Sequence, residues 1–240
     1  MTPSGNNRFP TTQWTLVGRL HHPDEAIVRR ALDDLCAQYH FPLYCYIRSR
    51  GFDHSDAEDA LHDFLAKLLR NQTFQSADPE KGRLRSFLAT SLQRFLINWN
   101  KQHQQPGKLH PLPAAEIEAR YLREIQTRNE DPELLFDRKW AHALIHRALN
   151  TLAATYATKD KSQLFETLRP VLLSGGSLRG EDTSRLAAAV GLRENTLRVA
   201  LHRLLGEFRQ TLEHEVLQTV SSPAEVQAEI QHLMNVLRHS

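Results

Sequence analysis

The chain has 240 residues, which fits one large domain or two small ones. Its 30 Lys and Arg nearly balance 28 Asp and Glu, so a net charge of +2 excludes a bulk polycation that coats nucleic acid. The two cysteines, Cys36 and Cys45, are too few for a disulfide framework or a cysteine-based zinc site.

Signals for export or membrane insertion are missing from the sequence. The opening residues, MTPSGNNRFPTTQW, contain no basic segment followed by an apolar run. No stretch approaches the roughly 18 consecutive apolar residues that a membrane span needs. We therefore expect a cytoplasmic protein without membrane contact.

Apolar residues recur at three- and four-residue spacing along most of the chain, which predicts an all-α fold. A first helix should open at Pro23-Asp24-Glu25, because proline suits the first helical position and acids favour the positive end of the helix dipole. Phe41-Pro42 should interrupt this helix, since proline disfavours helix in the residue before it. A second segment is then expected from Leu43 to Gly51.

The next expected helix is acidic. Ser55-Asp56-Ala57-Glu58 has the pattern of a capping box, in which the Ser and Glu side chains satisfy backbone N–H groups at a helix start. The acidic residues here are Asp53, Asp56, Glu58, Asp59 and Asp63. Such a face could dock a basic partner, although the helix dipole alone also favours acids in a first turn.

A basic helix is expected after Gly82. The run from Lys81 to Lys101 contains no acidic residue, and its basic residues are Lys81, Arg83, Arg85, Arg94 and Lys101. Cations that neutralise phosphates, interleaved with aromatic rings, are typical of single-strand binding. Phe95 and Trp99 fall on the apolar stripe, so core packing is their alternative role, and a solvated basic face is the alternative for the cations.

A polar, proline-containing stretch over residues 105–132 predicts a linker, with a short helix at 114–128. Helices should follow at 133–156 and 161–173, with a break at Ser174-Gly175-Gly176-Ser177. A final helix should begin at the capping box Ser222-Pro223-Ala224-Glu225.

Two short helices at 183–190 and 193–213, joined at Gly191, have the spacing of a helix-turn-helix. Opposite the apolar stripe of the second helix lies a polar face that could read the major groove. It consists of Arg193, Asn195, Thr196, Arg198, Val199, His202 and Arg203. Arg and Asn pair with base edges, and Val packs on a thymine methyl group. The alternative is a plain helical hairpin with a solvated basic face.

No motif predicts catalysis. His142 and His146 have the one-turn spacing of a helical metal site, but no third ligand is placed to complete it and the HExxH pattern is absent. Hydrolase signatures, Walker loops and dinucleotide fingerprints are also absent. We expect no catalytic residue, no metal and no cofactor.

The order of these features resembles the extracytoplasmic-function (ECF) sigma factors of bacterial RNA polymerase, over about residues 9–237. Tyr39-His-Phe-Pro-Leu-Tyr44 and Asp56-Ala-Glu-Asp59 resemble the opening and the polymerase-docking helix of sigma region two. Asp78-Pro-Glu-Lys-Gly82 and the residues that follow resemble the promoter-melting segment of region two. Residues 92–101 resemble the minus-ten recognition helix of the same region. Residues 178–208 are similar to region four.

The resemblance implies two small helical domains, a region two-like bundle and a helix-turn-helix region four-like domain, joined by a polar linker. The ranges implied are 1–22 for an N-terminal extension, 23–104 for region two, 105–132 for the linker, 133–214 for region four and 215–240 for a C-terminal helical extension.

The family also implies roles for the charged residues. Asp56, Asp59 and Asp63 would dock on the clamp helices of the polymerase largest subunit, and the flap of the core enzyme would be a second contact. The minus-ten and melting contacts would come from Lys81, Arg83, Arg85, Arg94, Asn98 and Lys101, and a loop at 74–82 would receive an extruded base. The helix-turn-helix face would read the minus-thirty-five duplex. Promoter DNA and core polymerase are the implied partners, with an anti-sigma factor or other regulatory protein as a further candidate.

Two other hypotheses stay open. A stand-alone helix-turn-helix regulator would use its N-terminal domain for dimerisation or sensing. A helical scaffold would have no DNA function at all, and replacing Arg198 and Arg203 would then leave binding to any duplex unchanged.

Overall fold

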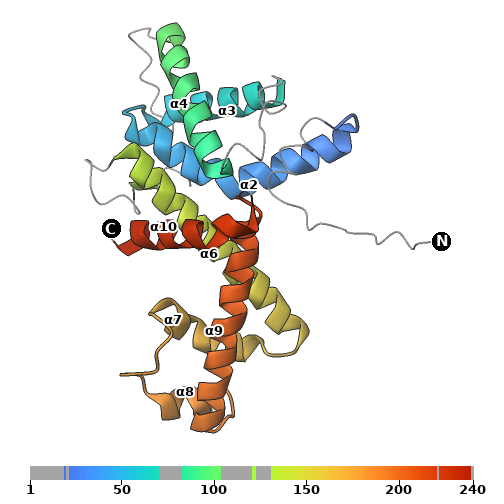
Figure 1. The fold of residues 1–240 in the computed structure, drawn as a ribbon, viewed down its shortest axis with the longest axis vertical. Helices are drawn as coiled ribbons and strands as arrows, with labels where there is room; N and C mark the ends of the chain where they lie inside the picture. Colours follow the sequence, from blue (N-terminus) through green and yellow to red (C-terminus); the bar gives the residue numbers. More distant parts are fainter. Residues whose placement is uncertain are drawn as a thin grey trace, which may run out of the picture. The chain divides into compact units, whose positions relative to one another are not determined.

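The computed structural model describes residues 19, 22–70, 83–103, 121–122, 131–220 and 222–238. Within these ranges the regular elements are helices and no strand occurs, so the predicted all-α fold is confirmed for this part of the chain. The chain divides into two compact units (Figure 1). Residues 144–215 form one unit, and the described residues on either side form the other. The expected domain ranges, with region four at 133–214 and a C-terminal extension at 215–240, stay predictions.

The first long helix, α2 (Glu25–Ser49), begins where the sequence predicts. The side chain of Asp24 caps it by accepting a hydrogen bond from the backbone N–H of Ala26 at 2.9 Å. The predicted interruption at Phe41-Pro42 is wrong, because α2 continues through Pro42. A proline inside a helix costs about 3 kcal/mol, and the burial of residues 42–47 offsets this cost.

Helix α3 (His54–Arg70) packs against α2, and α4 (Leu84–His103) packs against α3 (Figure 1). The predicted capping box at Ser55 is displaced: Asp53 accepts the hydrogen bond from the N–H of Asp56 at 2.8 Å, so the cap lies two residues earlier and the helix begins at His54. Between α3 and α4, the rings of Phe64 and Phe95 lie 5.5 Å apart in the core.

The first unit also contains the start of α6 (Pro132–Thr158) and the C-terminal helices η2 (Pro223–Glu225) and α10 (Val226–Arg238). Trp140 of α6 stacks on Tyr39 of α2 at a centroid distance of 4.6 Å. The predicted capping box at Ser222 forms only in part, because the Ser222 side chain makes no cap hydrogen bond and a 3-10 turn precedes α10. The expected short helix at 114–128 lies mostly outside the described residues.

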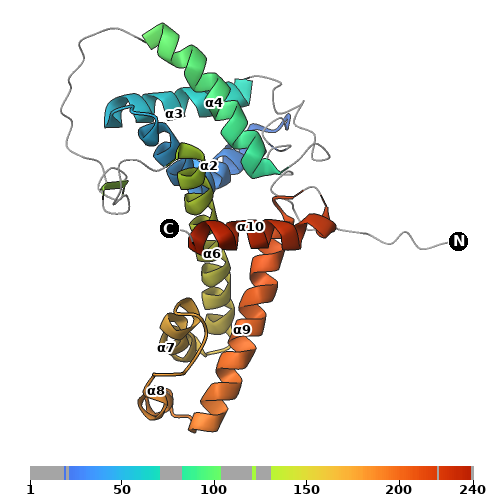
Figure 2. The same ribbon diagram turned by 60° about the vertical axis from the view of Figure 1, so that its left-hand side comes forward.

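The second unit contains the rest of α6, α7 (Ser162–Leu173), α8 (Thr183–Ala189) and α9 (Glu194–Leu217) up to Glu215 (Figure 2). An apolar cluster joins these helices; its buried members include Leu152, Tyr156, Phe165, Leu168, Leu197, Leu201 and Leu204. The predicted break after α7 is confirmed. Gly176 has φ +72°, and its N–H donates to the carbonyl of Val171 at 2.8 Å, which ends the helix.

Candidate nucleic-acid interface

The two helices of the predicted helix-turn-helix form in the second unit. The Asp182 side chain caps α8 by accepting a hydrogen bond from the N–H of Arg185 at 3.0 Å. Gly191 follows with φ +65°, a conformation that glycine adopts without strain. The N–H of Leu192 donates back to the carbonyl of Ala187 at 2.9 Å, which closes the turn before α9 begins at Glu194.

Helix α9 has one buried face and one exposed face. Leu197, Leu201 and Leu204 are buried in the apolar cluster. The residues of the predicted recognition face are all exposed, and they are Arg193, Asn195, Thr196, Arg198, Val199, His202 and Arg203. Val199 keeps 61% of its surface accessible, which leaves an apolar side chain in water at the centre of a polar face.

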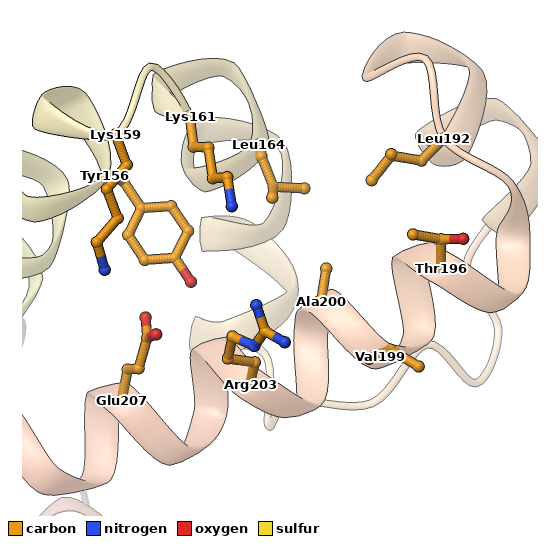
Figure 3. A pocket seen from close by; sticks show the side chains of 10 residues that line it. All are labelled: Tyr156, Lys159, Lys161, Leu164, Leu192, Thr196, Val199, Ala200, Arg203 and Glu207. Atoms are coloured by element: carbon orange, nitrogen blue, oxygen red, sulfur yellow. The ribbon is translucent and has the colours of Figure 1, made fainter.

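A hollow of about 250 Å³ lies beside this face, and Figure 3 shows its lining. Lys159 and Lys161 come from the turn between α6 and α7, while Thr196, Val199 and Arg203 come from α9. The Lys161 ammonium and the Arg203 guanidinium face the same hollow (Figure 3). Sequence reasoning missed both lysines, although two lysines around one residue at a helix break are a visible signal.

The turn that carries the lysines has a specific backbone geometry. Asp160 lies in the left-handed region at φ 56°. The N–H of Lys161 donates to the carbonyl of Tyr156 at 2.9 Å, and the N–H of Asp160 donates to the carbonyl of Ala157 at 3.1 Å. These bonds satisfy the last carbonyls of α6 and place one lysine on each side of the turn.

Tyr156 and Glu207 form the polar floor of the hollow. Burial raises the pKa of Tyr156 to about 12, and its hydrogen bond to Glu207 and the charge of Glu207 act in the same direction. The nearby Arg203 opposes this shift. The hydroxyl of Tyr156 is therefore protonated at neutral pH and donates a hydrogen bond to the carboxylate of Glu207. Glu207 is the one acidic residue among those that line the hollow. An anion that enters the hollow would meet the positive charges of Lys159, Lys161 and Arg203, which also line it.

The acidic helix α3 presents Asp56, Asp59 and Asp63 as exposed residues. Asp63 is also used within the unit, because its Oδ2 accepts a hydrogen bond from Nε1 of Trp99 at 2.9 Å. Trp99 is only 5% exposed and Phe95 only 8%, so both rings belong to the core and not to a surface that stacks bases.

The start of the basic helix differs from the expectation. Arg85 is buried, and its Nε donates to Glu229 Oε1 of α10 at 3.0 Å, while its Nη1 donates to Asp137 of α6. Arg83 Nη1 lies 2.7 Å from Glu229 Oε2. Both arginines, which the resemblance assigns to the opened DNA strand, are thus paired with carboxylates from α10 and α6 in this structure, and their contact with DNA stays a prediction.

This network is a part of the site that sequence reasoning missed. Glu229 is 1% exposed, and His232 Nε2 lies 2.8 Å from Oδ2 of Asp137. Burial disfavours the charge of Arg85, but the hydrogen bonds and charges of Glu229 and Asp137 outweigh it and leave the pKa of Arg85 above its ordinary value. Within the first unit, buried ion pairs thus join α10 to the start of α4, and the start of α4 to α6.

The other residues expected to contact the opened strand are either exposed on α4 or outside the described residues. Arg94, Asn98 and Lys101 are exposed along α4, and Asn98 Nδ2 donates to the carbonyl of Arg94 at 3.4 Å. Lys81 and most of the loop at 74–82 that was expected to receive a base lie outside the described residues. The exposed part of the expected single-strand surface is therefore the second half of α4.

Neither a metal centre nor a membrane span is found in the described ranges. No group of three or more His, Cys, Asp or Glu there could hold a metal ion, and His142 and His146 are both exposed. None of the described helices is long and apolar enough to cross a bilayer.

Comparison with models of protein families, with curated proteins and with solved structures found no match for this chain. The function is therefore argued from the interface itself.

Proposed function

We propose that this chain is a sigma factor of the ECF type, which binds core RNA polymerase and directs it to a set of promoters. The observation that carries the proposal is the face of α9: every residue expected to read the minus-thirty-five duplex is exposed, while the leucines behind them are buried. A helix held rigidly by its apolar face, with Arg and Asn outward, suits insertion into the major groove.

The hollow beside α9 supports duplex binding at this face. Lys159, Lys161 and Arg203 would contact phosphates next to the groove, which fixes the orientation of the helix without reading sequence. Arg198 and Asn195 would then contact base edges, and Val199 would contact a thymine methyl group.

The acidic helix supports a second partner of opposite charge. Asp56 and Asp59 are exposed on α3, and DNA would repel them. A basic surface on a protein is the partner that their charge favours, and in this proposal it is the clamp of core polymerase. The recognition and melting functions would lie in this chain, and the polymerase would perform the phosphoryl transfer.

One observation favours the second candidate, a stand-alone helix-turn-helix regulator. Arg83 and Arg85, which a sigma factor was expected to use on the opened strand, are paired with Glu229 and Asp137. A regulator that binds only duplex DNA needs no such strand contacts.

Reconstitution with core polymerase separates the two candidates. We expect the purified chain to start transcription from specific sites in a genomic library, and the double variant Asp56→Ala, Asp59→Ala to lose this activity while it still binds duplex DNA. The matched control is Asp33→Ala, Asp34→Ala, which removes two exposed acids from α2 of the same unit. Duplex binding without polymerase-dependent initiation at any fragment would favour the regulator.

A further inference from the structure

The hollow beside α9 is lined by charged groups of both signs. Lys159, Lys161 and Arg203 carry three positive charges and Glu207 carries one negative charge, so the sum over the lining is +2. Within the described ranges, neither Lys161 nor Arg203 forms an ion pair with a carboxylate. Because these two cations lack such a partner there, the hollow favours an anion with two negative charges.

Glu207 is the part of the lining that a DNA phosphate does not satisfy. Its carboxylate repels a phosphate and attracts an N–H donor. The Oε2 atom of Glu207 is buried and accepts no hydrogen bond from the described residues, which is destabilising for a buried acceptor. Figure 3 shows the carboxylate directed from α9 toward Tyr156. The terminal torsion of a Glu side chain is broad, so a small rotation turns this oxygen toward a donor in the hollow.

Apolar side chains form much of the remaining wall. They are Leu164 of α7, Leu192 of the turn before α9, and Val199 and Ala200 of α9. The apolar cluster of this unit holds these elements together, so the wall is formed without a ligand. The volume of about 250 Å³ lies just below the usual range of about 300–1,000 Å³ for drug-sized ligands. The hollow therefore suits a compact ligand whose body packs against aliphatic side chains.

A ligand that satisfies each part of this lining joins a dianion to a body that donates N–H bonds. A phosphate monoester carries a charge of about −1.5 to −2 at neutral pH, which matches the cations. The pairing edge of guanine presents neighbouring N–H donors, which suit a carboxylate. Adenine places an acceptor nitrogen beside its amino group, and Glu207 would repel that nitrogen.

We propose that this hollow binds a guanine mononucleotide, with the phosphate on Lys161 and Arg203 and the base edge on Glu207. Thr196, Val199 and Arg203 belong both to the lining and to the recognition face. A bound nucleotide would therefore compete with duplex DNA for α9. The nucleotide site stands apart from the proposed function, and the competition rests on it.

Isothermal titration calorimetry of the full chain tests the site with guanosine monophosphate, adenosine monophosphate and inorganic phosphate. We expect the guanine nucleotide to bind about tenfold more tightly than the adenine nucleotide, because its N–H donors reach a charged acceptor. Inorganic phosphate should bind more weakly than either nucleotide. Equal affinity for the two nucleotides would overturn the guanine site, and so would binding of inorganic phosphate alone.

Two variants separate the halves of the site. Glu207→Gln keeps the shape of the side chain and should weaken the guanine nucleotide about tenfold without weakening inorganic phosphate. Lys161→Ala, at an exposed position, should weaken both ligands by a similar factor. The matched control for Glu207 is Glu213→Gln, which removes the charge of a carboxylate of α9 that is paired with Arg209 at 3.2 Å and should change neither affinity. An equal loss of both ligands in Glu207→Gln would overturn the role of Glu207.

The competition is measured by fluorescence anisotropy of a labelled duplex as guanosine monophosphate is added. The apparent affinity for the duplex should fall about twofold when the nucleotide concentration equals its dissociation constant. Duplex binding that saturating nucleotide leaves unchanged would overturn the competition. Nucleotide binding by a chain that binds no duplex would reject the proposed function and keep the site. Promoter-directed initiation by a chain that binds no guanosine monophosphate would do the reverse.

Discussion

The exposed face of α9 and the start of α4 look alike in the sequence and differ in the structure. Both are helical segments rich in arginine. On α9, Arg193, Arg198 and Arg203 are exposed. At the start of α4, Arg85 is 8% exposed and bound to two carboxylates. Local positive charge therefore indicates a basic segment but not a basic surface.

The difference arises from partners that are distant in the sequence. Glu229 lies 144 residues after Arg85, so no pattern around Lys81–Lys101 could reveal it. On α9, Arg198 Nη2 lies 3.8 Å from Glu194 Oε2, one turn away, with both side chains about half exposed. Such a pair adds little stability and is readily exchanged for a phosphate.

The largest expected effect is on the buried pair. Glu229→Ala should lower the free energy of unfolding by about 3 kcal/mol, because buried Arg85 loses one of its two carboxylate partners and Arg83 loses its ion pair with Glu229. Urea unfolding followed by circular dichroism measures the loss. Glu194→Ala on α9, where the partner is exposed, should change stability by no more than about 0.5 kcal/mol. Similar losses for the two variants would erase the distinction between the segments.

The second effect is on DNA affinity. Arg198→Ala should weaken duplex binding by about 1–3 kcal/mol, because Arg198 is proposed to contact a base edge, and Arg203→Ala should weaken binding about equally on all duplex sequences, because Arg203 is proposed to contact a phosphate. Both variants should fold as stably as the wild type, because the side chains are exposed. Titration of promoter-length duplex DNA with each variant gives the numbers. Unchanged affinity in the double variant would support the scaffold hypothesis over both DNA-binding hypotheses.

The third effect is on the pH dependence of the free energy of unfolding, and it arises from Tyr156, a buried residue of the unit that contains α9. The pKa of Tyr156 is raised from 10.0 to about 12, so the protonated hydroxyl is favoured in the folded state. The resulting stabilisation is fully present below pH 10 and is lost as the pH rises toward about 12. Tyr156→Phe should therefore lose less stability than the wild type between pH 9 and pH 11.

Urea midpoints at the two pH values test this prediction, and the difference between the two proteins isolates Tyr156 from the other groups that titrate. Equal losses in both proteins would show that the bond to Glu207 does not favour the protonated hydroxyl.

The helices and the turns between them were largely predictable from the sequence, because their signals are local. Asp24, Gly176 and Gly191 each satisfy a backbone requirement within a few residues, and each was anticipated. Pro42 was misread because the burial of residues 42–47 offsets the local cost of proline. Burial depends on the whole unit and leaves no local pattern.

The candidate site was likewise predictable only where its signals are local in the sequence. The recognition face of α9 follows from periodicity alone, since the residues opposite a leucine stripe must face outward. The Arg85 network and the hollow beside α9 required elements that are distant in sequence to meet. Asp63 shows the intermediate case: its place on the acidic face was predicted, but its hydrogen bond to Trp99 was not.

The smallest expected effect is that of Lys161→Ala. This variant tests whether a cation beside α9 contacts a phosphate or helps to recognise bases. The Lys161 ammonium faces the hollow beside α9 (Figure 3), where a phosphate is the anion that a duplex in the proposed orientation would bring. Lys161→Ala should reduce the slope of log affinity against log salt by about 1, with little change in preference among duplex sequences. Arg209→Ala, which removes a cation that is 75% exposed and paired with Glu213 at 3.2 Å, is the control and should leave the slope unchanged. A lost sequence preference in Lys161→Ala would instead place this lysine among the residues that read bases.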